Sequence, residues 1–242
     1  MHKVLFVTGA SSDFGIRFME RNAANYETII AHYCNHAERL QKLQEQYGNK
    51  IILKQADLCD AEAVHRMMQE LSESGLMPDH ILHLAAKKLE YQRFSKRSAA
   101  DFEEELQCSV LSLVEILRTV LPAMARKKFG KVVVMLSACV CAKPPKFMST
   151  YTVSKYALLG TILALAEEYA EKGICINAVS PEMTDTAFLS EISPMIVEMN
   201  RKVSGTELPN AIKEIMNAEI RHNTECDVDQ MEQTVKNILG VK

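Results

Sequence analysis

Residues 4–15 read VLFVTGASSDFG, an apolar run followed by a turn of small residues. The run at 4–7 predicts a buried β-strand, and residues 14–23 have the pattern of a helix. A strand that leads through a glycine turn into a helix offers backbone N–H groups and a positive dipole end to a phosphate. This stretch therefore predicts a phosphate-binding loop in an α/β domain.

The rest of the chain continues the alternation of strands and helices. Apolar runs predict strands at 28–32, 51–53, 81–84, 131–136 and 174–179, and helices are expected at 37–47, 61–73, 99–126 and 152–171. Strands that are apolar throughout are typical of parallel sheets buried on both faces. We expect one Rossmann-like, doubly wound α/β domain over residues 1–242, with a parallel sheet between two helical layers and a helical substrate lid at about 184–225.

Composition narrows the class of partner. The 242 residues are 48% hydrophobic and 24% charged, with a net charge of −3. This balance shows no basic excess for nucleic acid and no polybasic run for anionic lipid. The apolar runs are too short to span a bilayer. We therefore expect a small-molecule partner, without nucleic acid or membrane.

Cysteine and histidine spacing bears on metals and on the compartment. Seven cysteines include Cys139-Val140-Cys141, a weak metal or redox signal, and the alternative is two plain thiols in a reducing cytosol. We favour the second interpretation. The seven histidines lack the spacing of metal ligands, so we expect no metal. The interpretation of the cysteines as plain thiols predicts a cytoplasmic location.

Polar and small residues follow the predicted strands, at the edge where ligands bind in this architecture. Among them, Tyr151 and Lys155 are four residues apart at the start of a helix and project from one face. A tyrosine hydroxyl titrates near about 10, and a neighbouring ammonium stabilises its phenolate. The pair predicts an acid–base group that exchanges a proton with a substrate oxygen.

These motifs resemble those of the short-chain dehydrogenase/reductase family, over residues 3 to about 190. Thr8, Gly9 and Gly15 match its Thr-Gly-x-x-x-Gly-x-Gly loop, and Asp13 stands at the middle glycine. Aspartate tolerates positive φ, and it is an alternative cap for the following helix. The resemblance implies hydride transfer between a nicotinamide cofactor and a carbonyl or secondary alcohol, with Tyr151 as acid–base group and Lys155 as its activator and ribose clamp.

The resemblance also predicts the cofactor contacts. The strand end at 31–36 contains no acid, whereas His32, His36 and Arg39 are potentially cationic side chains nearby, which favours NADP(H) over NAD(H). The alternative is that His36 and Arg39 are solvated residues at a helix start. The expected contact residues are Thr8, Gly9, Ser11, Ser12, Asp13, Phe14, Gly15, Tyr33, His36, Arg39, Asp57, Leu58, Ala85, Ala86, Tyr151, Lys155, Pro181, Thr184 and Thr186.

Two catalytic positions depart from the family pattern. The family places a serine thirteen residues before the tyrosine, where this chain has Ala138, with Ser137 beside it. Ser137 can polarise the substrate carbonyl only if the loop turns to present it. The family's helix asparagine falls at Ser109. The alternative function is a catalytically impaired nucleotide-binding or scaffold protein of the same fold.

The two long helices predict the oligomer. The run at 158–166 is apolar nearly all round, as in a helix buried against both a sheet and a partner. We expect a homodimer through the helices 99–126 and 152–171. The chain reaches Lys242 directly after its last predicted helix, so we expect no seventh strand, and the tetramer common in the family stays an open alternative.

Overall fold

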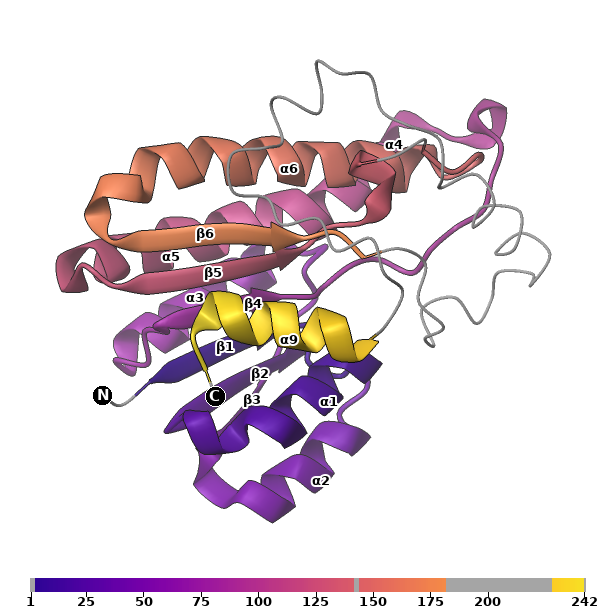
Figure 1. Ribbon diagram of the computed structural model, residues 1–242. Coiled ribbons are helices and arrows are strands. Elements are labelled where there is room, and N and C mark those ends of the chain that lie inside the picture. The colour runs from indigo at the N-terminus through magenta and orange to yellow at the C-terminus, as the bar shows by residue number, and fades with distance from the viewer. Residues whose placement is uncertain (1–2, 142–143, 182–227, 242) are drawn as a thin grey trace.

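The computed structural model describes residues 3–141, 144–181 and 228–241 and has a six-stranded parallel sheet at its centre (Figure 1). The strand order is β3-β2-β1-β4-β5-β6. The strands are β1 Val4–Thr8, β2 Thr28–Tyr33, β3 Ile51–Gln55, β4 His80–His83, β5 Gly130–Met135 and β6 Ile174–Val179. The predicted doubly wound, Rossmann-like fold class is confirmed.

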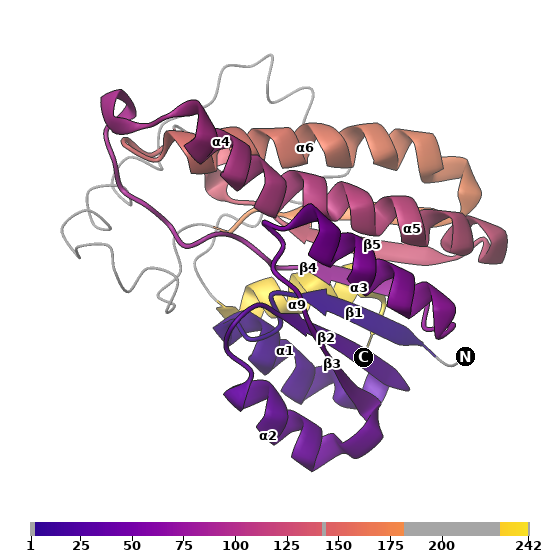
Figure 2. The ribbon, with the colours of Figure 1, turned by 180° about the vertical axis from the view of Figure 1, so that it is seen from behind.

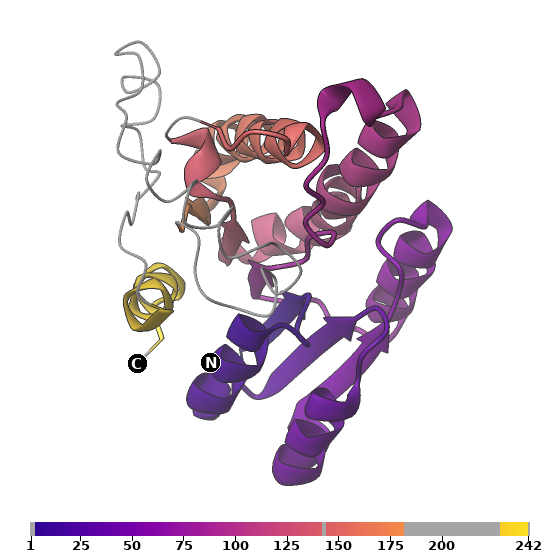
Figure 3. The same ribbon diagram turned by 90° about the vertical axis from the view of Figure 1, so that its right-hand side faces the viewer.

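Helices cover both faces of the sheet, as the end-on view shows (Figure 3). One layer contains α1 Asp13–Asn22, α2 Glu38–Tyr47 and α9 Val228–Leu239. The other contains α3 Ala61–Glu73, α4 Ala99–Leu106, α5 Ser112–Lys127 and α6 Ser149–Tyr169, and most of it faces the viewer in Figure 2. Each layer encloses its own apolar core because alternate side chains of the buried strands point to opposite faces. Phe6 and Val7, for example, are both fully buried in different cores.

The long helix predicted at 99–126 is interrupted. A π-helical turn, Gln107–Leu111, separates α4 from α5, and the Ser112 hydroxyl donates to the carbonyl of Cys108 within it. Such turns occur often at functional sites. The combined stretch Ala99–Lys127 is long and apolar enough to cross a membrane by length and composition, but 61% of its most apolar window is buried inside the protein.

The C-terminal helix α9 lies against β5, β6 and α1. Arg21 of α1 pairs with Asp229 at 2.8 Å and with Glu232 at 3.1 Å, and Arg17 pairs with both carboxylates. After α9 the structure describes Gly240 and Val241, and no seventh strand is found in the part of the chain that it describes. The predicted lid at 184–225 lies outside the part of the chain that the structure describes.

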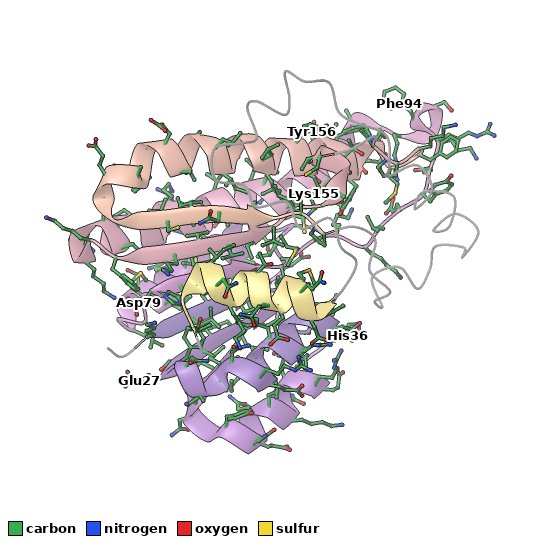
Figure 4. The ribbon with its side chains drawn as sticks, viewed as in Figure 1. Glu27, His36, Asp79, Phe94, Lys155 and Tyr156 are labelled. Carbon is green, nitrogen blue, oxygen red and sulfur yellow. The ribbon has the colours of Figure 1, made fainter. Side chains whose placement is uncertain are left out.

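The order of strands reverses between β1 and β4, which are hydrogen-bonded neighbours with Leu5 opposite His80. In open α/β sheets, ligands bind at the carboxyl ends of the strands beside such a reversal. Figure 4 shows Lys155 and His36 towards this edge, and Asp79 and Glu27 towards the opposite edge. Two of the predicted site residues, Lys155 and His36, thus lie towards the ligand-binding edge.

Candidate active site

The glycine turn after β1 is packed directly against the chain that leaves β4. Gly9 has φ +65°, and a Cβ atom there would lie 2.9 Å from the backbone N and Cα of Ala85. A side chain at this position would therefore meet both an unfavourable φ and a backbone collision. Two of the predicted cofactor-contacting segments, at 8–15 and 85–86, are brought together by this contact.

Ser12 is the N-cap of α1, so the alternative that Asp13 caps this helix is wrong. The Ser12 hydroxyl accepts a hydrogen bond from the Gly15 N–H at 3.1 Å, and Asp13 is the first residue of the helix. A Cβ atom on Gly15 would lie 2.6 Å from the Ala10 carbonyl oxygen, so the turn stays tight against the helix. The remaining loop residues, Ser11 and Phe14, are half-buried and buried. This loop and helix N-terminus have the form that holds a pyrophosphate.

Asp13 forms an ion pair with Arg39 near the N-terminus of α2. The guanidinium Nη1 lies 2.6 Å from the Asp13 carboxylate, and both side chains are about half exposed, at 51% and 40%. The pair neutralises a carboxylate that would otherwise stand unopposed beside a phosphate site. Tyr33 is half-buried at the end of β2, and His36 is exposed beyond it.

His32 is not available as a cation, which corrects its place among the three expected near the cofactor. Its Nδ1 accepts from the Gly9 N–H at 3.2 Å, and its Nε2 lies 3.0 Å from the Ala56 carbonyl oxygen. Burial lowers the pKa of His32 to about 4. The neutral ring therefore joins the glycine turn to the end of β3.

The chain after β3 carries the predicted adenine contacts. Asp57 is exposed and accepts a hydrogen bond from the Cys59 N–H at 2.9 Å, while Leu58 is buried. After β4, Ala85 is buried and Ala86 is half-buried. These residues and the glycine loop line the same edge of the sheet.

Tyr151 and Lys155 occupy the first two turns of α6, as predicted. The Lys155 ammonium is buried, donates to the Met135 carbonyl at the end of β5 at 2.9 Å, and lies 5.5 Å from the centroid of the Tyr151 ring. Burial lowers the pKa of Lys155. Burial also raises the pKa of Tyr151, and the nearby Cys139 adds to that rise.

The loop after β5 turns so that Ser137 meets Tyr151. Ser137 begins a short 3-10 turn, Ala138–Val140, and its hydroxyl accepts from the Cys139 N–H at 3.2 Å. A side-chain hydrogen bond from Ser137 to Tyr151 opposes the rise in the tyrosine's pKa. The Ala138 N–H donates to the Pro181 carbonyl at 2.8 Å, which ties this loop to the end of β6.

Ser109 lies in the π turn and is fully buried. Its hydroxyl donates to Oε1 of Glu105 at 3.0 Å, and the Ser154 hydroxyl lies 3.1 Å from the same oxygen. Glu105 is itself buried, with 6% of its surface exposed. Sequence reasoning missed Glu105 because it is the last of three consecutive glutamates, and its spacing of four from Ser109 is the one signal that could have distinguished it.

His83 ends β4 and joins the two sides of the site. Its Nδ1 lies 2.8 Å from Oγ1 of Thr8, which also accepts from the Ala85 N–H at 3.4 Å. Burial, with a contribution from the Lys155 charge, lowers the pKa of His83 to about 3. A neutral histidine thus connects the glycine loop with the interior beside Lys155.

Two predicted cofactor contacts and the expectation of no metal site are still to be compared with the structure. Thr184 and Thr186 lie outside the described residues. Within residues 3–141, 144–181 and 228–241, no group of three or more His, Cys, Asp or Glu side chains could hold a metal ion.

A reversing parallel sheet, a tight glycine turn before a helix and a Tyr–Lys pair beside a serine define a nicotinamide-dinucleotide oxidoreductase of the Rossmann class. A family model for short chain dehydrogenases matches residues 3–197. The chain belongs to the short-chain dehydrogenase/reductase family, whose members are NAD(P)-dependent oxidoreductases.

The sequence identity to individual relatives is low. The chain is 28% identical over 198 residues to the uncharacterized oxidoreductase YmfI of Bacillus subtilis, covering 80% of each chain. It is 25% identical over 190 residues to the NADPH-dependent pterin aldehyde reductase of Arabidopsis thaliana, covering 78% of this chain and 77% of the relative. A short-chain dehydrogenase from Streptomyces avermitilis has the same fold, with a TM-score of 0.73 at 21% identity, over 99% of this chain and 94% of that one.

Proposed function

We propose that this protein reduces a carbonyl group of a small molecule, or oxidises the corresponding alcohol, with NADP(H) as its preferred cofactor. The observation that carries the proposal is the convergence of Tyr151, Lys155 and Ser137 beside the strand end of β5. These three side chains can donate, tune and orient a proton at one oxygen atom.

The residues around the glycine turn fit the cofactor. The backbone at 9–15 and the N-terminus of α1 would hold the pyrophosphate, Asp57 the adenine, and Lys155 the nicotinamide ribose. When bound, the nicotinamide supplies or accepts the hydride. Protein side chains would orient the substrate and transfer the proton.

Tyr151 is proposed as the acid in the reductive direction. Burial raises its pKa, so the phenol is protonated at neutral pH and can give its proton to the alkoxide oxygen that forms on the substrate. Lys155 lies 5.5 Å from the ring centroid and stabilises the phenolate left behind. Ser137 donates a hydrogen bond to the developing oxyanion.

The preference for NADP(H) rests on charge. We take Arg39 and His36 as the residues that would bind a 2′-phosphate. Between the end of β2 and Arg39, Glu38 at the start of α2 is the one acid in the sequence. The similarity to a reductase named as NADPH-dependent supports the same choice. Asp13 competes for Arg39, so the preference is expected to be moderate.

We also propose a homodimer through the helical stretches 99–126 and 152–171. Three large apolar side chains on these helices are exposed: Leu111 at 52%, Val114 at 39% and Val153 at 43%. A second copy would bury them. Sedimentation at micromolar concentration tests this, and a monomer would contradict it.

The test of the function is carbonyl-dependent oxidation of NADPH by the wild type and by Tyr151→Phe. Suitable probes are phenanthrenequinone, ethyl acetoacetate and nitrobenzaldehyde. We expect turnover of at least one probe by the wild type and its loss in Tyr151→Phe, with nucleotide binding retained. An inert wild type that still binds NADPH would instead support the non-catalytic nucleotide-binding alternative, which Ala138 motivates.

A further inference from the structure

A buried carboxylate lies between α4 and α6, beneath the Tyr151–Lys155 pair. Glu105 projects from α4, which packs against α6 (Figure 1). Its Oε1 meets the hydroxyls of Ser109 at 3.0 Å and Ser154 at 3.1 Å. Both serines are fully buried, and Ser154 is the residue before Lys155. The cluster of Glu105, Ser109 and Ser154 therefore joins the π turn to the catalytic helix.

Hydroxyls hold Glu105, whereas two neighbouring cations bind other carboxylates and a third, Lys155, binds the Met135 carbonyl. Arg97 pairs with Glu90, and Lys87 pairs with Glu104 at 2.8 Å. An ion pair would favour the charged form of a buried carboxylate, but a hydroxyl can serve either form, because it both donates and accepts. The hydroxyl partners of Glu105 can therefore hydrogen-bond either to a carboxylate or to a carboxylic acid.

The hydrogen bonds show how the two states would be accommodated. The Ser154 hydroxyl has one proton and two acceptors within reach, Oε1 of Glu105 at 3.1 Å and the Tyr151 carbonyl at 2.9 Å. If Glu105 is ionised, Ser154 donates to it. If Glu105 is protonated, it donates to Ser154, and the serine proton turns to the Tyr151 carbonyl. Rotation of one hydroxyl converts one arrangement into the other without moving a heavy atom.

Glu105 also reaches the surface hollow on which Tyr151 opens. A small hollow is lined by both of these residues together with Thr150, Lys87, Arg97 and Asp101. Burial is the main cause of the pKa shifts of Tyr151 and Lys155, and the charge of Glu105 acts to raise both pKa values. Glu105 thus shares one hollow at the surface with Tyr151.

We propose that Glu105 is the proton relay of the active site, passing protons between solvent in the hollow and the Tyr151–Lys155 pair. In the reductive direction, Tyr151 gives its proton to the substrate alkoxide. The phenolate that is left, stabilised by the Lys155 ammonium, takes a proton from the Glu105 carboxylic acid through water in the hollow that Tyr151 and Glu105 both line, and the carboxylate takes one from solvent. The net transfer is one proton from solvent to substrate. This role rests on the proposed function, and it assigns to a carboxylate the work that the family pattern gives to an asparagine.

The matched variants are Glu105→Gln and Glu104→Gln. They make the same chemical change at adjacent positions of α4, but the side chain of Glu104 is 54% exposed. Glutamine keeps the acceptor oxygen for both serines and cannot carry the proton. With NADPH and the carbonyl probe that the wild type turns over best, we expect Glu105→Gln to lower kcat by about tenfold or more, and Glu104→Gln to change it by less than about twofold.

Isotope effects separate a relay from mere positioning. In Glu105→Gln, proton delivery becomes the slow step, so the rate loss in D2O grows and the effect of deuterium on the transferred hydride shrinks. NADPH affinity stays within about twofold of the wild type. Ser154→Ala, which removes the link to α6 and leaves Glu105 in place, should show the same changes in smaller measure.

Three outcomes would overturn the relay while leaving the proposed function intact. These are equal activity of Glu105→Gln and Glu104→Gln, a lower kcat with unchanged isotope effects, and a Ser154→Ala variant identical to the wild type. Absence of carbonyl-dependent turnover in the wild type would instead overturn the proposed function and the relay with it.

Discussion

The nucleotide side and the catalytic side of the site compensate for their departures from the family pattern through different contacts. On the nucleotide side, residues 8–15 and 32–39, Asp13 replaces a glycine at the surface and is balanced by one exposed ion pair with Arg39. On the catalytic side, residues 105–155, the changes at Ala138 and Ser109 are buried or half-buried and come with a turn that presents Ser137 and with Glu105 beside Ser109. An exposed charge is cheaply compensated, whereas an interior polar group needs a partner within hydrogen-bond distance.

Tyr151→Phe should have the largest effect. It removes the proposed acid and leaves the ring packing intact, so kcat should fall by about 10²–10⁴-fold. NADPH affinity should change little, because the hydroxyl faces the reacting centre. Steady-state rates and a fluorescence titration of the same preparation check both. Retention of activity would place the acid elsewhere.

Ser137→Ala and Ala138→Ser test which position supplies the carbonyl donor. We expect Ser137→Ala to lower kcat by about 10²–10³-fold, as for the loss of one oxyanion donor. Ala138→Ser adds a hydroxyl beside an existing donor and should leave kcat within about threefold of the wild type. The reverse ranking of the two variants would contradict the geometry of the 3-10 turn.

Because buried histidines are neutral in the folded protein, the free energy of unfolding should depend on pH in the acid range. Burial lowers the pKa of His32 to about 4, whereas its value in the unfolded chain is about 6.5. Between these values the unfolded state binds more protons, so the free energy of unfolding should fall as pH decreases from about 6.5 towards 4. Above pH 6.5 this group should contribute no pH dependence.

Denaturant titrations of the wild type and His32→Asn at several pH values measure this slope. The variant should lose up to about 1.4 kcal/mol per pH unit of the dependence in that window. His83, whose pKa is lowered to about 3, adds to the wild-type slope in the same direction and persists in the variant. Equal slopes in the two proteins would contradict a neutral, buried His32.

Gly9→Ala and Gly75→Ala separate backbone strain from collision on the nucleotide side. Both glycines have positive φ, +65° and +71°, but a Cβ on Gly75 meets nothing within 4 Å, whereas one on Gly9 meets the Ala85 backbone at 2.9 Å. Each substitution should cost about 1–2 kcal/mol in unfolding free energy for its φ. Gly9→Ala should lose more than Gly75→Ala and should also weaken NADPH binding. Equal losses would show that the turn does not need the close approach.

Asp13→Asn should have the smallest effect. It releases Arg39 from an exposed ion pair worth about 0–1 kcal/mol, so NADPH affinity should rise by no more than about fivefold. NADH affinity should change less, because that cofactor lacks the phosphate that Arg39 would bind. Calorimetry with both nucleotides measures the difference. A matching gain for NADH would show that Asp13 acts on the pyrophosphate instead.

The sequence predicted the architecture because strand and helix periodicity are local signals. All six strands fell within a few residues of their predicted bounds, and so did the helix that starts before Tyr151. The glycine turn and the Tyr–Lys pair followed from local motifs and from the family resemblance, and their common edge followed from topology.

Three features needed coordinates because they depend on contacts between distant segments. His32 carries the same signal as a surface cation, and its burial follows from the packing of β1, β2 and β3. The partner of Asp13 lies 26 residues away. Glu105 reads as one of three equivalent glutamates until α4 is packed on α6.

The most direct test of the account is a titration of the purified protein with NADPH and with NADH, followed by nicotinamide fluorescence. We expect micromolar binding of NADPH and weaker binding of NADH, as a tight glycine turn beside Arg39 requires. Binding of neither nucleotide would contradict the account, because it would mean that Asp13 closes the phosphate loop and that this fold serves something other than hydride transfer.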